Sequence, residues 1–480
     1  MQDFTERALD RACAAGATFA EIRIVDRRSE SIEIKNGSPE AISNRTSYGW
    51  GVRVVVAGGW GFASSFRVEK DEIDRVVDLA IQIARASATS KKEDVRLSPS
   101  EKVQQSYRTP LKIDPFTVPL AQRIDLLLTA EGLLRQEKAV KISQAFMTLF
   151  SEKKFFANSE GSYIEQEIIE CGAGLTAKAL KDGEIQVRSY PNSFRGNFTT
   201  GGYEFIESLN LAEHAPRVAS EAAALLSAPQ CPSKETTLII DGSQLALQVH
   251  ESCGHPIELD RVFGSEASYA GTSFLTTEKL GNFRYGSKIV NIIADATVPG
   301  GLGTFGFDDE GVPAQRTQII DKGIFVGYLT SRETAVQLGQ LSNGTMRADG
   351  WSNIPLIRMT NINLQPGEWT FDDMIASTEE GLYVETNRSW SIDDRRLNFQ
   401  FGTEIGWEIK DGKLAQMVKN PTYTGITPQF WGNCDAICND DHWQMWGTPN
   451  CGKGEPGQTA HVGHGAAPAR FRNVRVGVMK

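Results

Sequence analysis

The segment 237-TLIIDGSQLALQVHESCGHP-256 organises this 480-residue chain, because it predicts a strand, a turn and a helix that ends in an unusual motif. Thr237–Ile240 is a short apolar run typical of a buried strand. Asp241 or Ser243 is the expected N-cap of the helix that follows. Leu245, Val249 and Cys253 are expected to form the core face of this helix, and His250 opens the motif near its end.

His250, Glu251 and His255 form an H-E-x-x-x-H pattern in a chain that has only six histidines. Imidazole is a common zinc ligand, and zinc peptidases place their general base directly after the first histidine. At about 100° per residue, the two histidines point about 140° apart on a regular helix. They can meet at one metal only if the helix widens into a π-turn or ends between them. Gly254 and Pro256 favour an ending, since proline disfavours the α conformation for His255, so we expect a metal site at a broken helix end.

A catalytic zinc site needs a third protein ligand, and spacing alone leaves five candidates. Three are nearby carboxylates, and one is a cysteine three residues after the first histidine, on the same helical face. The last is a cysteine in a Gly- and Pro-rich loop, which can approach a metal closely. The carboxylates are those of Glu258, Asp260 and Glu266, the cysteine near the motif is Cys253, and the cysteine in the loop is Cys451. If no metal binds, the motif is a capped helix end whose second histidine bonds a backbone carbonyl.

The composition, 40% hydrophobic and 23% charged, is that of an ordinary soluble globular protein. A net charge of −10 without a cluster of Lys or Arg argues against a nucleic-acid partner. No apolar run approaches the ~20 residues that span a bilayer, and the first residues lack the features of a signal peptide. Seven scattered cysteines fit a reducing compartment, so we expect a cytoplasmic protein with no membrane partner.

The order of elements predicts an α+β fold, mainly antiparallel sheets with flanking helices, in which N-terminal α/β units precede a large strand-rich C-terminal domain. Two units follow the order helix, strands, helix, and a polar, proline-containing linker at about 89–115 separates them. The remainder is mostly strand and turn, with hairpin signals such as Lys410-Asp411-Gly412-Lys413. We therefore expect three domains: an N-terminal α+β domain at 1–95, a second at 112–228, and a metal-binding catalytic domain at 232–480.

Other metal-ligating side chains have a weaker pattern. Cys434, Cys438 and His442 are spaced four apart, as on one helical face, but no fourth partner has zinc-finger spacing. Buried free cysteines are common, and we expect these two to be structural. His464, thirteen residues beyond Cys451, could contact a metal ligand from behind or face the substrate, but we expect it to pack within a loop.

Together these motifs resemble the TldD/PmbA family, and the similarity spans nearly the whole chain. Besides the H-E-x-x-x-H motif, it rests on the segments Gly51–Ser64, Asp308–Gly311, Asn450–Lys453, Val462–Gly465 and Phe471–Gly477. The resemblance implies a TldD-type zinc metallopeptidase that hydrolyses unfolded peptides. At the matching positions it implies Zn²⁺ ligands at His250, His255 and Cys451, with Glu251 as the general base.

The same resemblance carries an alternative function and a partner. The PmbA (TldE) branch pairs with TldD and lacks the histidine motif, so the second hypothesis is a non-catalytic partner subunit with a structural metal. Glu251 and both histidines favour the peptidase. The resemblance also implies a dimer, either with a PmbA/TldE-like partner or with a second copy. The substrate is expected to add as an extended strand to a sheet edge.

Overall fold

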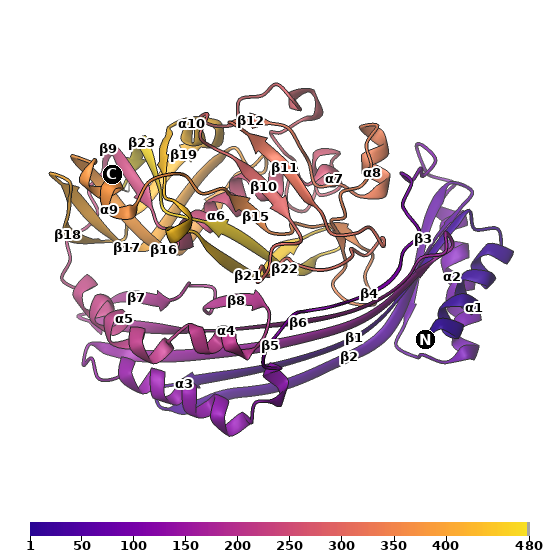
Figure 1. The fold of residues 1–480 in the computed structure, drawn as a ribbon, viewed down its shortest axis with the longest axis horizontal. Coiled ribbons are helices and arrows are strands. Elements are labelled where there is room, and N and C mark those ends of the chain that lie inside the picture. Colours follow the sequence, from indigo (N-terminus) through magenta and orange to yellow (C-terminus); the bar gives the residue numbers. More distant parts are fainter. Residues whose placement is uncertain (478–480) are drawn as a thin grey trace.

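One long, curved sheet fills the N-terminal half of the chain, and the C-terminal domain packs against its concave side (Figure 1). The computed structural model describes residues 1–477. Strand order is β3-β2-β1-β5-β6-β4, with β7 and β8 also paired to β6, and only the β4–β6 pairing is parallel. The strands are β1 (Phe19–Lys35), β2 (Ser38–Val56), β3 (Gly59–Ser65), β4 (Gln104–Arg108), β5 (Val140–Asn158), β6 (Tyr163–Lys181), β7 (Glu184–Tyr190) and β8 (Asn197–Thr200).

Helices cover the other face of this sheet in two groups, one near each end of the long strands (Figure 1). Side chains along β1 alternate between the two faces of the sheet, so residues an even number of positions apart point to the same face. Ile22 packs in the core under α1 and α2, and Ile34 packs in the core under α3 and α5. Arg23 points the opposite way and donates to the Asn353 carbonyl of the C-terminal domain at 2.6 Å. The helices are α1 (Gln2–Ala14), α2 (Lys70–Ser87), α3 (Leu120–Leu134), α4 (Tyr203–Ser208) and α5 (Leu211–Leu225).

The two N-terminal units expected from the sequence share this single sheet. β1 pairs with β5 along almost its whole length, from Glu21 opposite Asn158 to Lys35 opposite Gln144. The expected linker at 89–115 is wrong in part, because it contains β4, which adds to the sheet beside β6. The α+β class with mainly antiparallel sheets is confirmed. The division into domains at 1–95, 112–228 and 232–480 stays a prediction.

The C-terminal domain is built on a seven-stranded sheet that closes on itself. Its order is β16-β9-β23-β19-β17-β18, with β20 beside β23, and an additional β16–β17 pairing completes the ring. Only β9 and β16 pair in parallel. The strands are β9 (Lys234–Ile240), β16 (Glu380–Ile392), β17 (Asn398–Lys410), β18 (Lys413–Lys419), β19 (Thr422–Ile426), β20 (Cys434–Ile437) and β23 (Ala469–Val476).

Smaller elements surround this ring and carry the loops of the candidate site. A four-stranded sheet and two ribbons are made of β10 (Ile292–Asp295), β11 (Arg316–Asp321), β12 (Ile324–Phe325), β15 (Ile362–Leu364), β13 (Met346–Arg347), β14 (Leu356–Ile357), β21 (Gln444–Lys453) and β22 (Gln458–Ala466). The helices are α6 (Gly242–Val249), α7 (Leu259–Val262), α8 (Arg332–Gln337), α9 (Phe371–Ala376) and α10 (Thr427–Gly432). Along residues 1–477, no helix combines the length and apolar character that crossing a membrane requires.

Arg188 on β7 ties the N-terminal sheet to the C-terminal ring. Its guanidinium, only 2% exposed, lies 2.8 Å from Glu221 of α5, 3.1 Å from Glu385 of β16 and 3.3 Å from Glu404 of β17. Burial raises the pKa of Glu385 to about 7 even though Arg188 opposes that shift. One cation therefore compensates three carboxylates contributed by three elements.

Replacing Arg188 with Met is expected to lower the free energy of unfolding by about 3–5 kcal/mol, because buried carboxylates would lose their only shared cation. Chemical denaturation would measure the change. The matched control is Arg217→Met, which removes an exposed partner of the same Glu221 and is expected to cost less than about 1 kcal/mol. Equal losses in both variants would contradict a special role for Arg188.

Candidate metal centre

The H-E-x-x-x-H motif lies on a helix whose position is fixed by the strand before it. The Asp241 carboxylate accepts a hydrogen bond from the Ser243 backbone at 2.9 Å and caps α6, one of the two residues expected to do so. All eight residues of α6 are buried. Its two glutamine side chains, Gln244 and Gln248, hydrogen-bond the Tyr423 hydroxyl of β19 at 2.8 and 3.1 Å. The helix is therefore held rigidly inside the domain.

A π-turn brings the two histidines together. Residues His250–Gly254 form π-helix, and the His255 N–H donates to the His250 carbonyl, a bond that spans five residues. The expected break is wrong: His255 keeps α conformation (φ −65°, ψ −41°) despite Pro256, and a short 3-10 turn follows. The wider turn removes the angular mismatch of a regular helix. A Cβ at Gly254 would lie 2.2 Å from the Met359 sulfur, so any larger residue here would displace the Met359 side chain.

Cys451 of β21 completes a compact group of three ligand atoms. Its sulfur lies 3.5 Å from His250 Nε2 and 3.9 Å from His255 Nε2, and the three atoms all lie within 4.8 Å of one another. Tetrahedral zinc with ordinary bond lengths separates a nitrogen and a sulfur ligand by about 3.6 Å. The donor set therefore fits a zinc-sized ion. Among residues 1–477, no fourth His, Cys, Asp or Glu belongs to this group.

Hydrogen bonds behind the imidazoles orient both rings. His255 Nδ1 lies 2.9 Å from the Glu258 carboxylate, and His250 Nδ1 lies 2.8 Å from His464 Nε2. His464 Nδ1 in turn faces the Ile362 carbonyl at 3.3 Å, so it donates there and its Nε2 accepts from His250. Both histidines thus direct Nδ1 toward these partners and Nε2 toward Cys451, the orientation of metal-binding histidines. The loop-packing role expected for His464 is wrong in this respect.

The electrostatics of the group favour a thiolate. Burial opposes ionisation of Cys451, but His250 and Arg358 outweigh it and hold the pKa of the thiol well below its ordinary value. Arg358 also donates to the Cys451 carbonyl at 2.6 Å, which fixes the backbone of β21. Burial lowers the pKa of His255 well below its ordinary range, so this imidazole stays neutral. A neutral histidine and a thiolate are the forms that bind metals.

Glu251 is buried and forms an ion pair with Arg396. The Arg396 guanidinium lies 2.8 Å from the Glu251 carboxylate and comes from the β16–β17 hairpin. The Asp393 carboxylate accepts from the Leu397 backbone at 2.8 Å and holds this hairpin in shape. Sequence reasoning missed Arg396, because nothing in its local sequence connects it with a motif 145 residues earlier.

The other sequence candidates lie outside the ligand group. Glu258 bonds His255 from behind, Asp260 pairs with Lys453 at 2.7 Å, and Glu266 pairs with Arg261 at 2.9 Å. Cys253 is buried in the hydrophobic core. Of the five alternatives for a third ligand, only Cys451 joins the two histidines.

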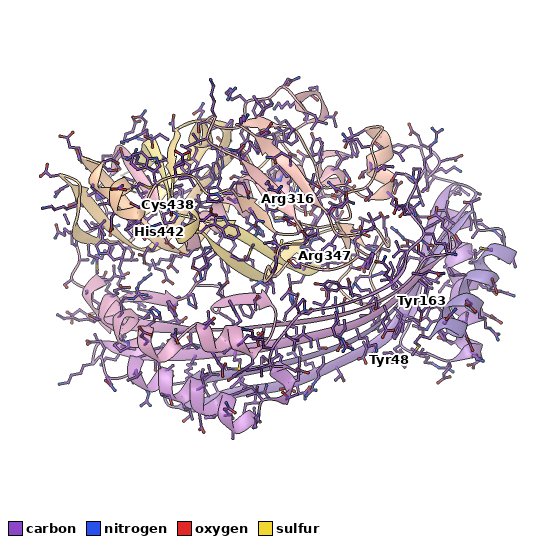
Figure 2. All side chains as sticks on the ribbon, viewed as in Figure 1. Tyr48, Tyr163, Arg316, Arg347, Cys438 and His442 are labelled. Carbon is purple, nitrogen blue, oxygen red and sulfur yellow. The ribbon has the colours of Figure 1, made fainter. Side chains whose placement is uncertain are left out.

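Cys434, Cys438 and His442 form no metal group within the described part of the chain. The helical spacing expected for them is wrong, because Cys434 begins strand β20. Cys438 is buried in a hydrophobic cluster, and His442 accepts a hydrogen bond from the Phe371 backbone. Figure 2 shows where both residues lie in the C-terminal domain. Both cysteines are free, as expected of structural residues.

Comparisons with known proteins agree along the whole chain. Family models match residues 20–84 (PmbA/TldA metallopeptidase domain 1), 113–228 (central domain) and 233–477 (C-terminal domain). A metalloprotease of Methanocaldococcus jannaschii is 32% identical over 94% of this chain and 95% of its own. A zinc metalloprotease TldD homolog of Saccharolobus solfataricus is 21% identical over 98% of both chains. The crystal structure of TldE from Thermococcus kodakarensis has the same fold, with a TM-score of 0.74, 16% identity and coverage of 98% of this chain and 99% of that one.

Proposed function

Because the chain belongs to the PmbA/TldD family of metallopeptidases, we propose that it is a zinc-dependent peptidase that hydrolyses unfolded peptides. In this proposal His250, His255 and Cys451 hold the zinc ion, and Glu251 is the general base. The observation that carries it is the convergence of two Nε2 atoms and one sulfur within 4.8 Å, without a fourth ligand among residues 1–477. Three protein ligands and one open position are typical of catalytic zinc sites.

Zinc is the metal that this donor set favours. Two imidazoles and a thiolate suit zinc better than calcium or magnesium, which prefer oxygen ligands. The name of the Saccharolobus solfataricus relative, a zinc metalloprotease, supports the same choice. A zinc ion supplies Lewis acidity, which polarises a peptide carbonyl and makes water more acidic.

The residues of the chain itself supply the proton transfers. Glu251 accepts a proton from the attacking water and passes it to the leaving amine, the usual role of a positioned carboxylate. Arg396, whose guanidinium lies 2.8 Å from the Glu251 carboxylate, is a positioning residue that orients this carboxylate. The buried setting of Glu251, 6% exposed, excludes most bulk water from the proton transfer.

Removing the metal with a chelator is expected to abolish peptide hydrolysis, and adding back one equivalent of zinc is expected to restore it. The fold should survive, because three large hydrophobic clusters hold the protein together, and Cys451 is the one member of the metal group within them. Hydrolysis of an unfolded labelled peptide and far-UV circular dichroism would be followed in the same samples. If the chelated protein unfolds, the metal has a structural role, as in the alternative of a non-catalytic partner subunit. If hydrolysis continues without metal, the activity does not depend on zinc and the proposal is contradicted.

A paired assembly and a peptide substrate follow from the same proposal. The TldE fold similarity supports a dimer with a TldE-like partner or with a second copy. β2 offers an edge for pairing or for an added peptide strand, because residues 38–48 are almost all exposed and β3 pairs only with residues 50–56. The seven free cysteines fit a reducing compartment such as the cytoplasm.

A further inference from the structure

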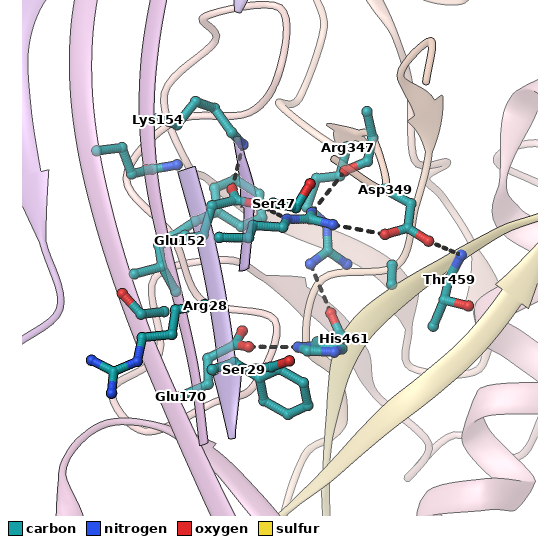
Figure 3. Close-up of a pocket in the computed structure, with 18 of the residues that line it drawn as sticks. Arg28, Ser29, Ser47, Glu152, Lys154, Glu170, Arg347, Asp349, Thr459 and His461 are labelled. Carbon is teal, nitrogen blue, oxygen red and sulfur yellow. Dashed lines mark hydrogen bonds and ion pairs between the residues drawn. The ribbon is translucent and has the colours of Figure 1, made fainter. Parts of the chain in front are cut away.

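A cavity of about 400 Å³ lies between the concave face of the N-terminal sheet and the C-terminal domain (Figure 3). Strands β1, β2, β5 and β6 form one wall, and loops and strands of the C-terminal domain form the other. Ligand sites commonly have volumes of about 300–1,000 Å³ and often lie between domains. The cavity therefore has the size and the location of a binding site, and the proposed proton chemistry does not use it.

The acidic residues of this cavity already have partners. Each of its four carboxylates contacts a basic side chain: Glu152 with Arg27 at 2.5 Å, Asp349 with Arg27 at 2.7 Å, Asp309 with Lys154 at 2.6 Å, and Glu170 with His461 at 2.5 Å. Against these four, the lining contains five Arg and Lys residues. The surplus is one positive charge, which matches a singly charged anion better than a phosphate.

Of the five cations that line the cavity, Arg347 and the exposed Arg45 have no ion-pair partner in the described part of the chain, and Arg347 is the less exposed of the two. No carboxylate lies within ion-pair distance of it in the described part of the chain, although it lines the cavity and lies where the C-terminal domain faces the sheet (Figure 2). Its guanidinium donates to the carbonyls of His461, at 2.7 Å, and Met359, and its buried Nε has no partner. Burial, with help from nearby Arg358, lowers the pKa of Arg347 to about 10, as expected of an uncompensated charge.

The cavity lies one strand away from the metal centre. Cys451 of β21 is directly opposite Ala460 of β22, and Ala460 and His461 line the cavity. Side chains of β22 alternate between two faces. His461 contacts Glu170 on the cavity side, whereas His464 contacts His250 on the metal side. A peptide bound in the cavity would therefore lie beside β22, the strand that pairs with the Cys451 strand.

We propose that this cavity binds one carboxylate group of the peptide substrate, with Arg347 as its principal donor. The inference rests on the proposed peptidase function and adds a substrate preference to it. A planar guanidinium matches a carboxylate geometrically. Phe150, Phe305 and Phe307 supply apolar walls for the adjoining part of the peptide. The carboxylate comes either from the peptide C-terminus or from an Asp or Glu side chain.

Binding of uncut peptides to the zinc-loaded Glu251→Gln protein tests this proposal independently of catalysis. Fluorescence anisotropy would compare two peptide pairs: a free C-terminus against its amide, and an internal Glu against Gln. In one of the two pairs, the peptide with the carboxylate is expected to bind about tenfold more tightly than its neutral counterpart, which is the effect of one charge-assisted hydrogen bond. The pair that shows this difference identifies the source of the carboxylate. Acid and neutral peptides that bind equally in both pairs would overturn the proposal, and failure to hydrolyse peptides would not affect the measurement.

Arg347→Gln in the same background is expected to abolish this preference, so that the peptide with the carboxylate and its neutral counterpart bind with about the same affinity. The matched control is Arg316→Gln, an exposed arginine outside the cavity, which should leave the ratio unchanged. Zinc content and thermal denaturation would verify that each variant is folded. If Arg347→Gln does not fold, Arg347→Lys keeps the charge but loses the planar fork, and the ratio should fall by about threefold. An undiminished ratio in a folded Arg347 variant would overturn the proposal.

Discussion

Glu251→Gln is expected to lower the rate of peptide hydrolysis by about 10²–10⁴-fold while the protein keeps its zinc, because the substitution removes only the proton acceptor. Glutamine has nearly the same shape, and its side-chain oxygen can still accept the hydrogen bond that Arg396 donates at 2.8 Å. The three proposed ligand atoms are unchanged. Single-turnover hydrolysis and metal analysis of the same preparation would measure both effects.

The matched control for this prediction is Glu278→Gln, an exposed glutamate of the same domain, which should keep full activity. Hydrolysis by Glu251→Gln at the parental rate would contradict the role of Glu251 as base. Loss of zinc from Glu251→Gln would instead indicate that this carboxylate contributes to the metal site.

Cys451→Ser is expected to weaken zinc binding by more than about a hundredfold. Replacing a residue that only hydrogen-bonds a metal ligand costs up to about a hundredfold in metal affinity, and the loss of a ligand itself should cost more. The reason is the loss of a thiolate, since a serine hydroxyl at this position stays protonated and is a much poorer zinc ligand. Activity should fall in proportion to the zinc that is lost. Competition with a chromogenic chelator would measure the affinity, and elemental analysis would measure the stoichiometry.

Cys253→Ser provides the control for Cys451→Ser within the motif itself. Cys253 is buried in the hydrophobic core, so its replacement is expected to reduce stability and leave the zinc affinity unchanged. One zinc per chain in Cys451→Ser would transfer the third ligand to another residue. A simultaneous loss of zinc from Cys253→Ser would point to Cys253.

The histidine pair was predictable, but its geometry was only partly so. Two histidines five residues apart can share one metal only if the helix forms a π-turn or ends between them. Pro256 made an end of the helix the better expectation. The structure adopts the π-turn because the His255 N–H keeps its bond to the His250 carbonyl, and Met359 fills the space beside Gly254. This packing depends on a residue more than one hundred positions away, so local pattern could not supply it.

Contacts between residues far apart in the chain also explain why other features of the site and the fold could not be predicted from the sequence. Cys451 was one of five candidates by spacing, and resemblance alone selected it. Arg396 and Arg347 have no local signature, since each acts through a partner that tertiary folding brings near. The antiparallel α+β class followed from alternation and hairpin turns, whereas the pairing of β1 with β5 across two expected domains did not, because strand partners are set by the assembled sheet.

The place of β9 in the ring has a consequence for the order of folding. β9 leads directly into the helix that carries both histidines, yet it lies between β16 and the C-terminal strand β23. A nascent chain that has exposed the histidine motif still lacks both neighbours of this strand, and also lacks Cys451. Closing such long loops is slow and entropically costly, so the site forms late. The proposed zinc site would therefore be complete only after the C-terminal domain has folded, and an incompletely synthesised chain would lack the proposed activity.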